Sequence, residues 1–147
     1  MSKNNTESLT TSRGSCLCKN IRFLLTGSPI NTVLCHCDNC GRTSGVGFMA
    51  NSFFKKTQVD MVSDTSIKTY EDSNTDSGGT INRQFCGNCG SPLFTTNASY
   101  PELIIVTSGS LEKDVGRFWV PKMELYCKGR RAWLGAVNGT QKFDVMF

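Results

Sequence analysis

Cysteine is the residue type that most restricts what this chain can fold into. Eight cysteines occur in 147 residues, and seven of them fall into three short groups. The groups are Cys16-Leu17-Cys18, Cys35-His36-Cys37-Asp38-Asn39-Cys40 and Cys86-Gly87-Asn88-Cys89. The N-terminal segment is polar and lacks the apolar stretch of a secretory signal, so we expect a cytoplasmic protein. In that compartment, cysteines bind metals or react more often than they form disulfides.

The pair Cys86 and Cys89 has the form of a zinc knuckle, because the glycine after each cysteine allows a tight turn. Tetrahedral Zn²⁺ requires further ligands at about 2.3 Å from the ion. Cys16 and Cys18 supply them most simply. The spacing therefore predicts a closed site that ties the N-terminal edge of the domain to its middle. A closed site leaves no coordination position for a substrate, so its predicted role is structural.

The remaining group, Cys35, Cys37 and Cys40, offers an odd number of thiolates. Three protein ligands and one open position are typical of a catalytic zinc. The alternative is a second structural site closed by His36, Cys127 or a carboxylate. His36 lies between two ligands on an expected strand, so its side chain should point to the opposite face. Cys127 is more typical of a small buried residue on a strand than of a metal ligand.

Alternating side chains indicate a β protein. Ile21, Phe23 and Leu25 alternate with less apolar neighbours, which predicts a strand that ends before Gly27. Val, Ile, Phe, Tyr and Thr recur in further short segments, and Gly, Asn, Asp or Pro separate most of them. We expect additional strands at 31–36, 46–54, 58–62, 66–71, 80–85, 92–96, 102–108 and 122–127. The pattern favours one mainly antiparallel β domain.

Helix signals are weak by comparison. Asp38 can cap a turn through residue 42, and residues 110–113 can form another. Residues 1–13 are rich in Ser, Thr and Asn, which predicts a disordered tail, and residues 14–147 are expected to form the single domain.

The charge pattern does not indicate a nucleic-acid-binding protein. The formal net charge is +4, but a four-thiolate zinc site contributes roughly −2 and a three-thiolate site roughly −1, which leaves about +1. Basic residues are scattered, with a single tight cluster at 128–131, and no basic stripe is present. The longest aliphatic run, residues 103–106, is far shorter than the roughly 20 residues of a membrane-spanning helix. We therefore expect neither nucleic acid nor a membrane as a partner.

The cysteine groups and their surroundings resemble the glutathione-dependent formaldehyde-activating enzyme family (GFA, which includes centromere protein V-like members). The number, order and spacing of the cysteines match, and the resemblance extends from about Gly14 to Trp133. The matching segments are Cys16-Leu17-Cys18, Ile21-Arg22-Phe23, Cys35-His36-Cys37-Asp38-Asn39-Cys40, Arg42-Thr43-Ser44-Gly45 and Phe85-Cys86-Gly87-Asn88-Cys89-Gly90-Ser91-Pro92-Leu93. Pro121, Tyr126 and Trp133 also fit the usual C-terminal part of the family.

The resemblance implies an Mss4-like, mainly β fold with two Zn²⁺ ions per chain. It implies a structural zinc on Cys16, Cys18, Cys86 and Cys89, and a catalytic zinc on the other three grouped cysteines. The activity attached to the family name is the condensation of glutathione with formaldehyde to S-hydroxymethylglutathione, and the wider group consists of carbon–sulfur lyases. We therefore expect a zinc-dependent carbon–sulfur lyase or thiol–aldehyde adduct-forming enzyme that acts on a glutathione-type thiol.

Thiol activation is the chemistry we expect at Cys35, Cys37 and Cys40, because metal coordination removes the proton from a thiol whose free pKa is about 8.5. Arg42 is a candidate for holding a substrate carboxylate in bidentate fashion, and a surface role fits it equally well. Three acidic residues are candidates for proton transfer, and each is also typical of an ordinary surface carboxylate. They are Asp38, Glu71 and Glu102.

Two departures from the family pattern leave other functions open. Gly41, beside the expected catalytic zinc, stands where a larger polar or basic residue is common, and Lys19-Asn20 replaces a frequent Gly-Ala. One alternative is a family relative that acts on a different small molecule in a biosynthetic pathway. The other is a non-catalytic zinc module that binds a macromolecule. The sequence predicts no oligomeric state.

Overall fold

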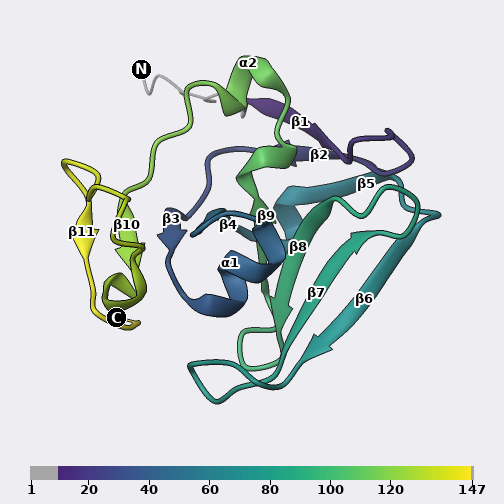
Figure 1. Cartoon of the computed structure of the whole chain (residues 1–147). Coiled ribbons are helices and arrows are strands. Elements are labelled where there is room, and N and C mark those ends of the chain that lie inside the picture. The colour runs from purple at the N-terminus through teal and green to yellow at the C-terminus, as the bar shows by residue number, and fades with distance from the viewer. Residues whose placement is uncertain (1–9, 147) are drawn as a thin grey trace, which may run out of the picture.

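A computed structural model describes residues 10–146 and arranges them as two β-sheets with short helices at their edges (Figure 1). The strands are β1 (Thr11–Ser15), β2 (Arg22–Thr26), β3 (Asn31–Cys35), β4 (Met49–Lys55), β5 (Val59–Ser63), β6 (Ile67–Asp72), β7 (Ile81–Cys86), β8 (Pro92–Asn97), β9 (Leu103–Thr107), β10 (Met123–Leu125) and β11 (Gln141–Lys142). The helices are α1 (Asp38–Ser44) and α2 (Lys113–Gly116), with 3₁₀ turns η1 (Lys56–Gln58), η2 (Ser108–Ser110) and η3 (Cys127–Gly129). None of these helices is long and apolar enough to cross a membrane.

The smaller sheet has the strand order β1-β2-β5, and the larger has the order β11-β10-β3-β4-β9-β8-β7-β6. All neighbouring strands are antiparallel except two pairs, because β10 runs parallel to both β3 and β11. Figure 1 shows β10 and β11 at the edge of the molecule, beside the strand that leads into α1. The strand that carries Cys35 is therefore paired with a segment from the end of the chain.

The two-residue period of the strands divides the larger sheet into two faces. On one face, Phe54 and Val106 pack in a core with Phe23 and Leu25 of β2. This core includes the predicted alternating residues of the first strand, all of them 1% exposed or less. The other face carries a second buried cluster, formed by Val33, Cys35, Cys40, Met49, Leu125 and Tyr126. Cysteines of the expected catalytic group thus lie on the face that is turned away from the smaller sheet.

The mainly β fold is confirmed, and the structure contains a strand in or near every segment where one was predicted. The parallel pairs make the larger sheet mixed rather than wholly antiparallel. The helical turn predicted through residue 42 is present as α1, but Cys37 rather than Asp38 is its N-cap. The turn predicted at 110–113 is not present, because the backbone of Leu111 bridges to Gly14 and α2 begins only at Lys113.

The segment predicted to be a disordered tail, residues 1–13, extends too far toward the C-terminus. β1 begins at Thr11, inside the segment expected to be disordered, and it pairs along its whole length with β2. Polar residues form this strand because its backbone groups bond to β2, and Glu112 N–H also donates to the Arg13 carbonyl at 2.9 Å. Residues 1–9 of the predicted tail lie outside the described residues.

Candidate metal centres

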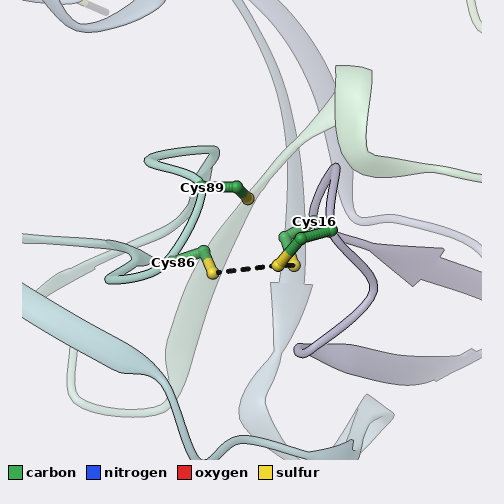
Figure 2. Close-up of side chains that lie close together, drawn as sticks. Cys16, Cys86 and Cys89 are labelled. Atoms are coloured by element: carbon green, nitrogen blue, oxygen red, sulfur yellow. Dashed lines mark hydrogen bonds between the residues drawn. The ribbon is translucent and has the colours of Figure 1, made fainter.

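The first candidate centre is the four-cysteine cluster, formed by Cys16, Cys18, Cys86 and Cys89. The four Sγ atoms lie within 4.8 Å of one another, and Figure 2 shows Cys16 and Cys86 directed toward each other from separate loops. The Sγ atom of Cys18 lies 3.6 Å from that of Cys16 and 3.7 Å from that of Cys86. A tetrahedral zinc with bonds of about 2.3 Å requires sulfur separations of about 3.8 Å. The cluster therefore fits a zinc ion.

Two tight turns position these sulfurs. Cys16 and Cys18 lie between β1 and β2, whereas Cys86 ends β7 and Cys89 lies in the turn that leads to β8. Ser91 joins the two turns, because its Oγ accepts the Leu17 N–H at 3.0 Å and lies 3.2 Å from the Cys89 Sγ. The Ser91 hydroxyl, followed by its backbone N–H, lowers the pKa of Cys89 to about 5. The turn thus favours the thiolate that a metal requires.

The second candidate centre is the three-cysteine cluster, formed by Cys35, Cys37 and Cys40. Its Sγ atoms also lie within 4.8 Å of one another. Cys35 ends β3, and Cys37 is the N-cap of α1, where its Sγ accepts the Cys40 N–H at 3.3 Å. One helical turn therefore brings the second and third cysteines to the end of the strand.

Charge within this cluster is concentrated on Cys37. Hydrogen bonds from the thiols of Cys35 and Cys40 lower the pKa of Cys37 to about 2. The hydrogen bond to Cys37, together with burial, raises the pKa of Cys35. One thiolate held by two thiols is a compact anionic set that suits a soft divalent cation such as Zn²⁺.

A guanidinium lies beside the three-cysteine cluster, and the sequence did not single it out. Arg83 of β7 is 8% exposed, and its positive charge favours the thiolate forms of Cys37 and Cys40. Its Nε donates to Asp72 Oδ2 at 2.8 Å, and Asp72 also accepts from the Asn39 amide of α1. Burial alone would lower the pKa of Arg83. The hydrogen bond to Asp72 and the nearby Cys40 outweigh this effect and raise the pKa. No local motif marks Arg83, because its neighbours are ordinary strand residues.

His36 lies behind the cluster, as predicted. It is 2% exposed, and its Nε2 lies 3.0 Å from Oε1 of Glu124, which is fully buried in β10. Glu124 also accepts hydrogen bonds from Arg130, Val137 N–H and the Thr140 hydroxyl. This network anchors the residue between Cys35 and Cys37 to the C-terminal segment.

The three-cysteine cluster opens onto a cavity of about 370 Å³. All three cysteines line it, together with residues of β3, β4, β7, β8, β9 and β10. Tyr126 also lines it, in a left-handed backbone conformation (φ 54°, ψ 45°) that is unusual for an aromatic residue and is found most often at functional sites. Burial, followed by electrostatic repulsion from the surrounding acidic groups (Cys35, then Asp76), raises the pKa of Tyr126. Its hydroxyl therefore stays protonated at neutral pH.

The other residues singled out in the sequence lie away from the cavity wall. Exposed Arg42 donates to Asn39 Oδ1 at 3.4 Å, and Asp38 pairs with Arg131 at 3.1 Å. Glu71 and Glu102 are exposed and do not line the cavity. Cys127 belongs to neither cluster in residues 10–146. Its Sγ lies 3.5 Å from the Glu124 carbonyl and 3.4 Å from Arg130 Nη2.

The family model of the glutathione-dependent formaldehyde-activating enzyme matches residues 11–129, which include all seven clustered cysteines. The chain belongs to this family. The two cysteine clusters of this family member are therefore candidate metal sites, and the residues present in each fit Zn²⁺ in number, donor type and spacing.

A curated relative and a solved structure are similar to the chain. A Halomonas elongata protein whose name proposes it as a glutathione-dependent formaldehyde-activating enzyme is 30% identical over 108 residues, or 71% of this chain and 68% of the relative. A crystal structure of a Rhodobacter sphaeroides protein superposes with a TM-score of 0.54 at 19% identity, and the match covers 68% of this chain and 87% of that one. The second likeness concerns the fold alone.

Proposed function

We propose that this chain is a zinc-dependent carbon–sulfur lyase that forms or cleaves an adduct between a thiol and an aldehyde at the three-cysteine cluster. The observation that carries the proposal is that this cluster opens onto a cavity large enough for a small molecule. The name of the Halomonas elongata relative, which refers to glutathione and formaldehyde, supports the same chemistry. The four-cysteine cluster is proposed as a structural zinc site, because its four thiolates leave no ligand position open.

Zn²⁺ bound by Cys35, Cys37 and Cys40 would supply a fourth coordination position at which a thiol loses its proton near neutral pH. The adduct forms when the thiol sulfur joins the carbonyl carbon and the thiol proton ends on the carbonyl oxygen, so no further reactant is required. Tyr126 lines the cavity, and its protonated hydroxyl is the proposed donor to that oxygen. Arg83 offsets the negative charge of the thiolates.

The same chemistry favours a reducing, cytoplasmic location, because free thiolate ligands oxidise in secretory compartments. All eight cysteines are free thiols in the structure.

The test compares Cys40→Ser with Cys86→Ser, and Cys127→Ser is the matched control because it removes a thiol outside both clusters. Zinc content, circular dichroism and turnover are measured on each variant, with adduct formation from a thiol and formaldehyde followed by NMR. We expect Cys40→Ser to stay folded, keep one zinc and lose turnover. Cys86→Ser should lose soluble folding, and Cys127→Ser should keep both metals and its activity.

Two outcomes contradict the proposal. A Cys40→Ser protein that keeps full turnover would show that the three-cysteine cluster is not the reaction centre. A wild-type protein that binds two zinc ions but turns over no thiol–aldehyde pair would favour a non-catalytic zinc module.

A further inference from the structure

The wall of the cavity beyond the cysteines is largely apolar. Alternate residues of the larger sheet face it and bring aliphatic and aromatic side chains to the surface that a bound molecule would contact. The principal ones are Val33, Phe53, Ile81, Leu103, Ile105 and Leu125. They come from β3, β4, β7, β9 and β10, so the apolar surface belongs to the rigid sheet rather than to a loop.

Formal charges are few on this wall. Asp76 and Arg83 are the charged residues among those that line the cavity, apart from the thiolates. The Arg83 guanidinium is already paired with Asp72 at 2.8 Å. A three-thiolate zinc site adds a net charge of roughly −1. The surroundings of a bound molecule are therefore negative, and no unpaired cation faces them within residues 10–146.

Glutathione fits this charge pattern poorly. At neutral pH it carries two carboxylates and one ammonium group, and a carboxylate buried without a cation is strongly disfavoured. An uncharged body would lose little hydration on entering and would gain from contact with the apolar wall.

One residue of the cavity wall holds a buried polar atom without a partner. Asn51 of β4 is 7% exposed and lines the cavity, and its Oδ1 has no hydrogen-bond partner within the described part of the chain. Its strand neighbour Phe53 faces the same way, so Asn51 sits within the apolar surface. A buried acceptor without a donor destabilises the protein. A ligand with an N–H or O–H group would satisfy it.

We infer that the substrate is a thiol, or the aldehyde adduct of a thiol, with an uncharged apolar body and a hydrogen-bond donor directed to Asn51, and that it is not glutathione. This inference rests on the proposed function, because it places the thiol sulfur at the three-cysteine cluster. The apolar wall, the lack of an unpaired cation and the buried acceptor each point to it.

Matched ligands test the inference on the full chain loaded with Co²⁺ in place of zinc. N-(2-mercaptoethyl)benzamide has a thiol, an amide N–H and an apolar ring, and its N-methyl derivative lacks only the N–H. Calorimetry gives the dissociation constants, and the sulfur-to-cobalt absorption band reports contact of the thiol with the metal. We expect the benzamide to bind at least tenfold more tightly than glutathione and about fivefold more tightly than its N-methyl derivative.

Three variants test which residues of the cavity determine the preference between these ligands. Asn51→Leu should abolish the difference between the benzamide and its N-methyl derivative. Ile105→Lys, or Leu103→Lys if the first does not fold, should weaken benzamide binding at least fivefold and strengthen glutathione binding. Val62→Lys is the control for added charge, because Val62 lies on β5 of the other sheet and is 59% exposed, and it should change neither affinity.

The outcomes separate this inference from the proposed function. If glutathione binds more tightly than the benzamide and shifts the absorption band, the thiol chemistry stands and the inferred substrate class is wrong. If the benzamide binds in an Asn51-dependent way and leaves the band unchanged, the cavity preference stands and the thiol chemistry at the cluster is wrong. Equal responses of the two benzamides to Asn51→Leu would overturn the role of Asn51.

Discussion

Replacing Glu124 with Gln should destabilise the protein measurably, although residue 124 is not a candidate metal ligand. Its carboxylate is fully buried and accepts from four groups, His36 Nε2, Arg130 Nη2, Val137 N–H and the Thr140 hydroxyl. Burial alone would raise the pKa of Glu124, but these partners outweigh it and lower the pKa from 4.5 to about 2. A glutamine at position 124 is uncharged, so His36 and Arg130 would lose the negative group that they contact in the wild-type protein.

The size of the effect follows from the pKa. At about 1.4 kcal/mol for each pKa unit, the shift corresponds to at most about 3.5 kcal/mol of folding free energy. Arg130 and Lys142 are partly open to solvent, with side chains 20% and 38% exposed, so screening reduces the expected loss to about 2 kcal/mol. For a domain of this size, that loss lowers Tm by about 4–8 °C.

The assay is thermal unfolding of wild type and Glu124→Gln at a fixed zinc concentration across a pH series. Because the folded pKa of Glu124 is depressed, its stabilisation is fully present above about pH 4.5 and is lost as the pH falls toward 2. The difference in Tm between the two proteins should therefore be constant near neutral pH and shrink in acid. Glu102→Gln, at an exposed position, is the control and should change Tm by less than about 1 °C. Equal Tm values for wild type and Glu124→Gln at pH 7 would refute the reasoning.

Three further results are expected. Gly14→Ala should lower the free energy of unfolding by about 1–3 kcal/mol in a urea titration, because the added Cβ would lie 2.2 Å from the Phe23 ring. Gly109→Ala is the control and should have little effect, because no atom lies within 4 Å of its added Cβ. A metal chelator should abolish the native circular dichroism spectrum, and a chelated protein with an unchanged spectrum would show that neither cluster stabilises the fold. Tyr126→Phe should lower the rate of adduct formation at least tenfold in the NMR assay without lowering zinc content, and unchanged turnover would exclude its hydroxyl from proton transfer.

The sequence predicted the two cysteine clusters well because cysteine spacing is largely a local signal. Cys86-x-x-Cys89 and the Cys35–Cys40 group each span only a few residues, so their members necessarily lie close together. The orientation of His36 also followed from strand geometry, since it lies between two residues that face the cavity.

The substrate side of the site was not predictable in the same way. Asn51 and Arg83 are single polar residues in strands, and their meaning depends on which strands become neighbours in the larger sheet. Tyr126 was noted only as part of the family pattern, and its left-handed backbone carries no sequence signature. The β1 strand was missed because backbone pairing with β2, rather than apolar side chains, holds it in place.

The parallel pairing of β3 with β10 has a consequence for the order in which the protein matures during synthesis. The last ligand of the four-cysteine cluster, Cys89, leaves the ribosome well before residues 123–126, which complete the wall beside Cys35. Folding during translation proceeds from the N-terminal side at about 5–20 residues per second. For several seconds after Cys89 is made, all seven clustered cysteines are therefore available, while the cavity wall beside Cys35 still lacks the segment that completes it and remains open to the solvent.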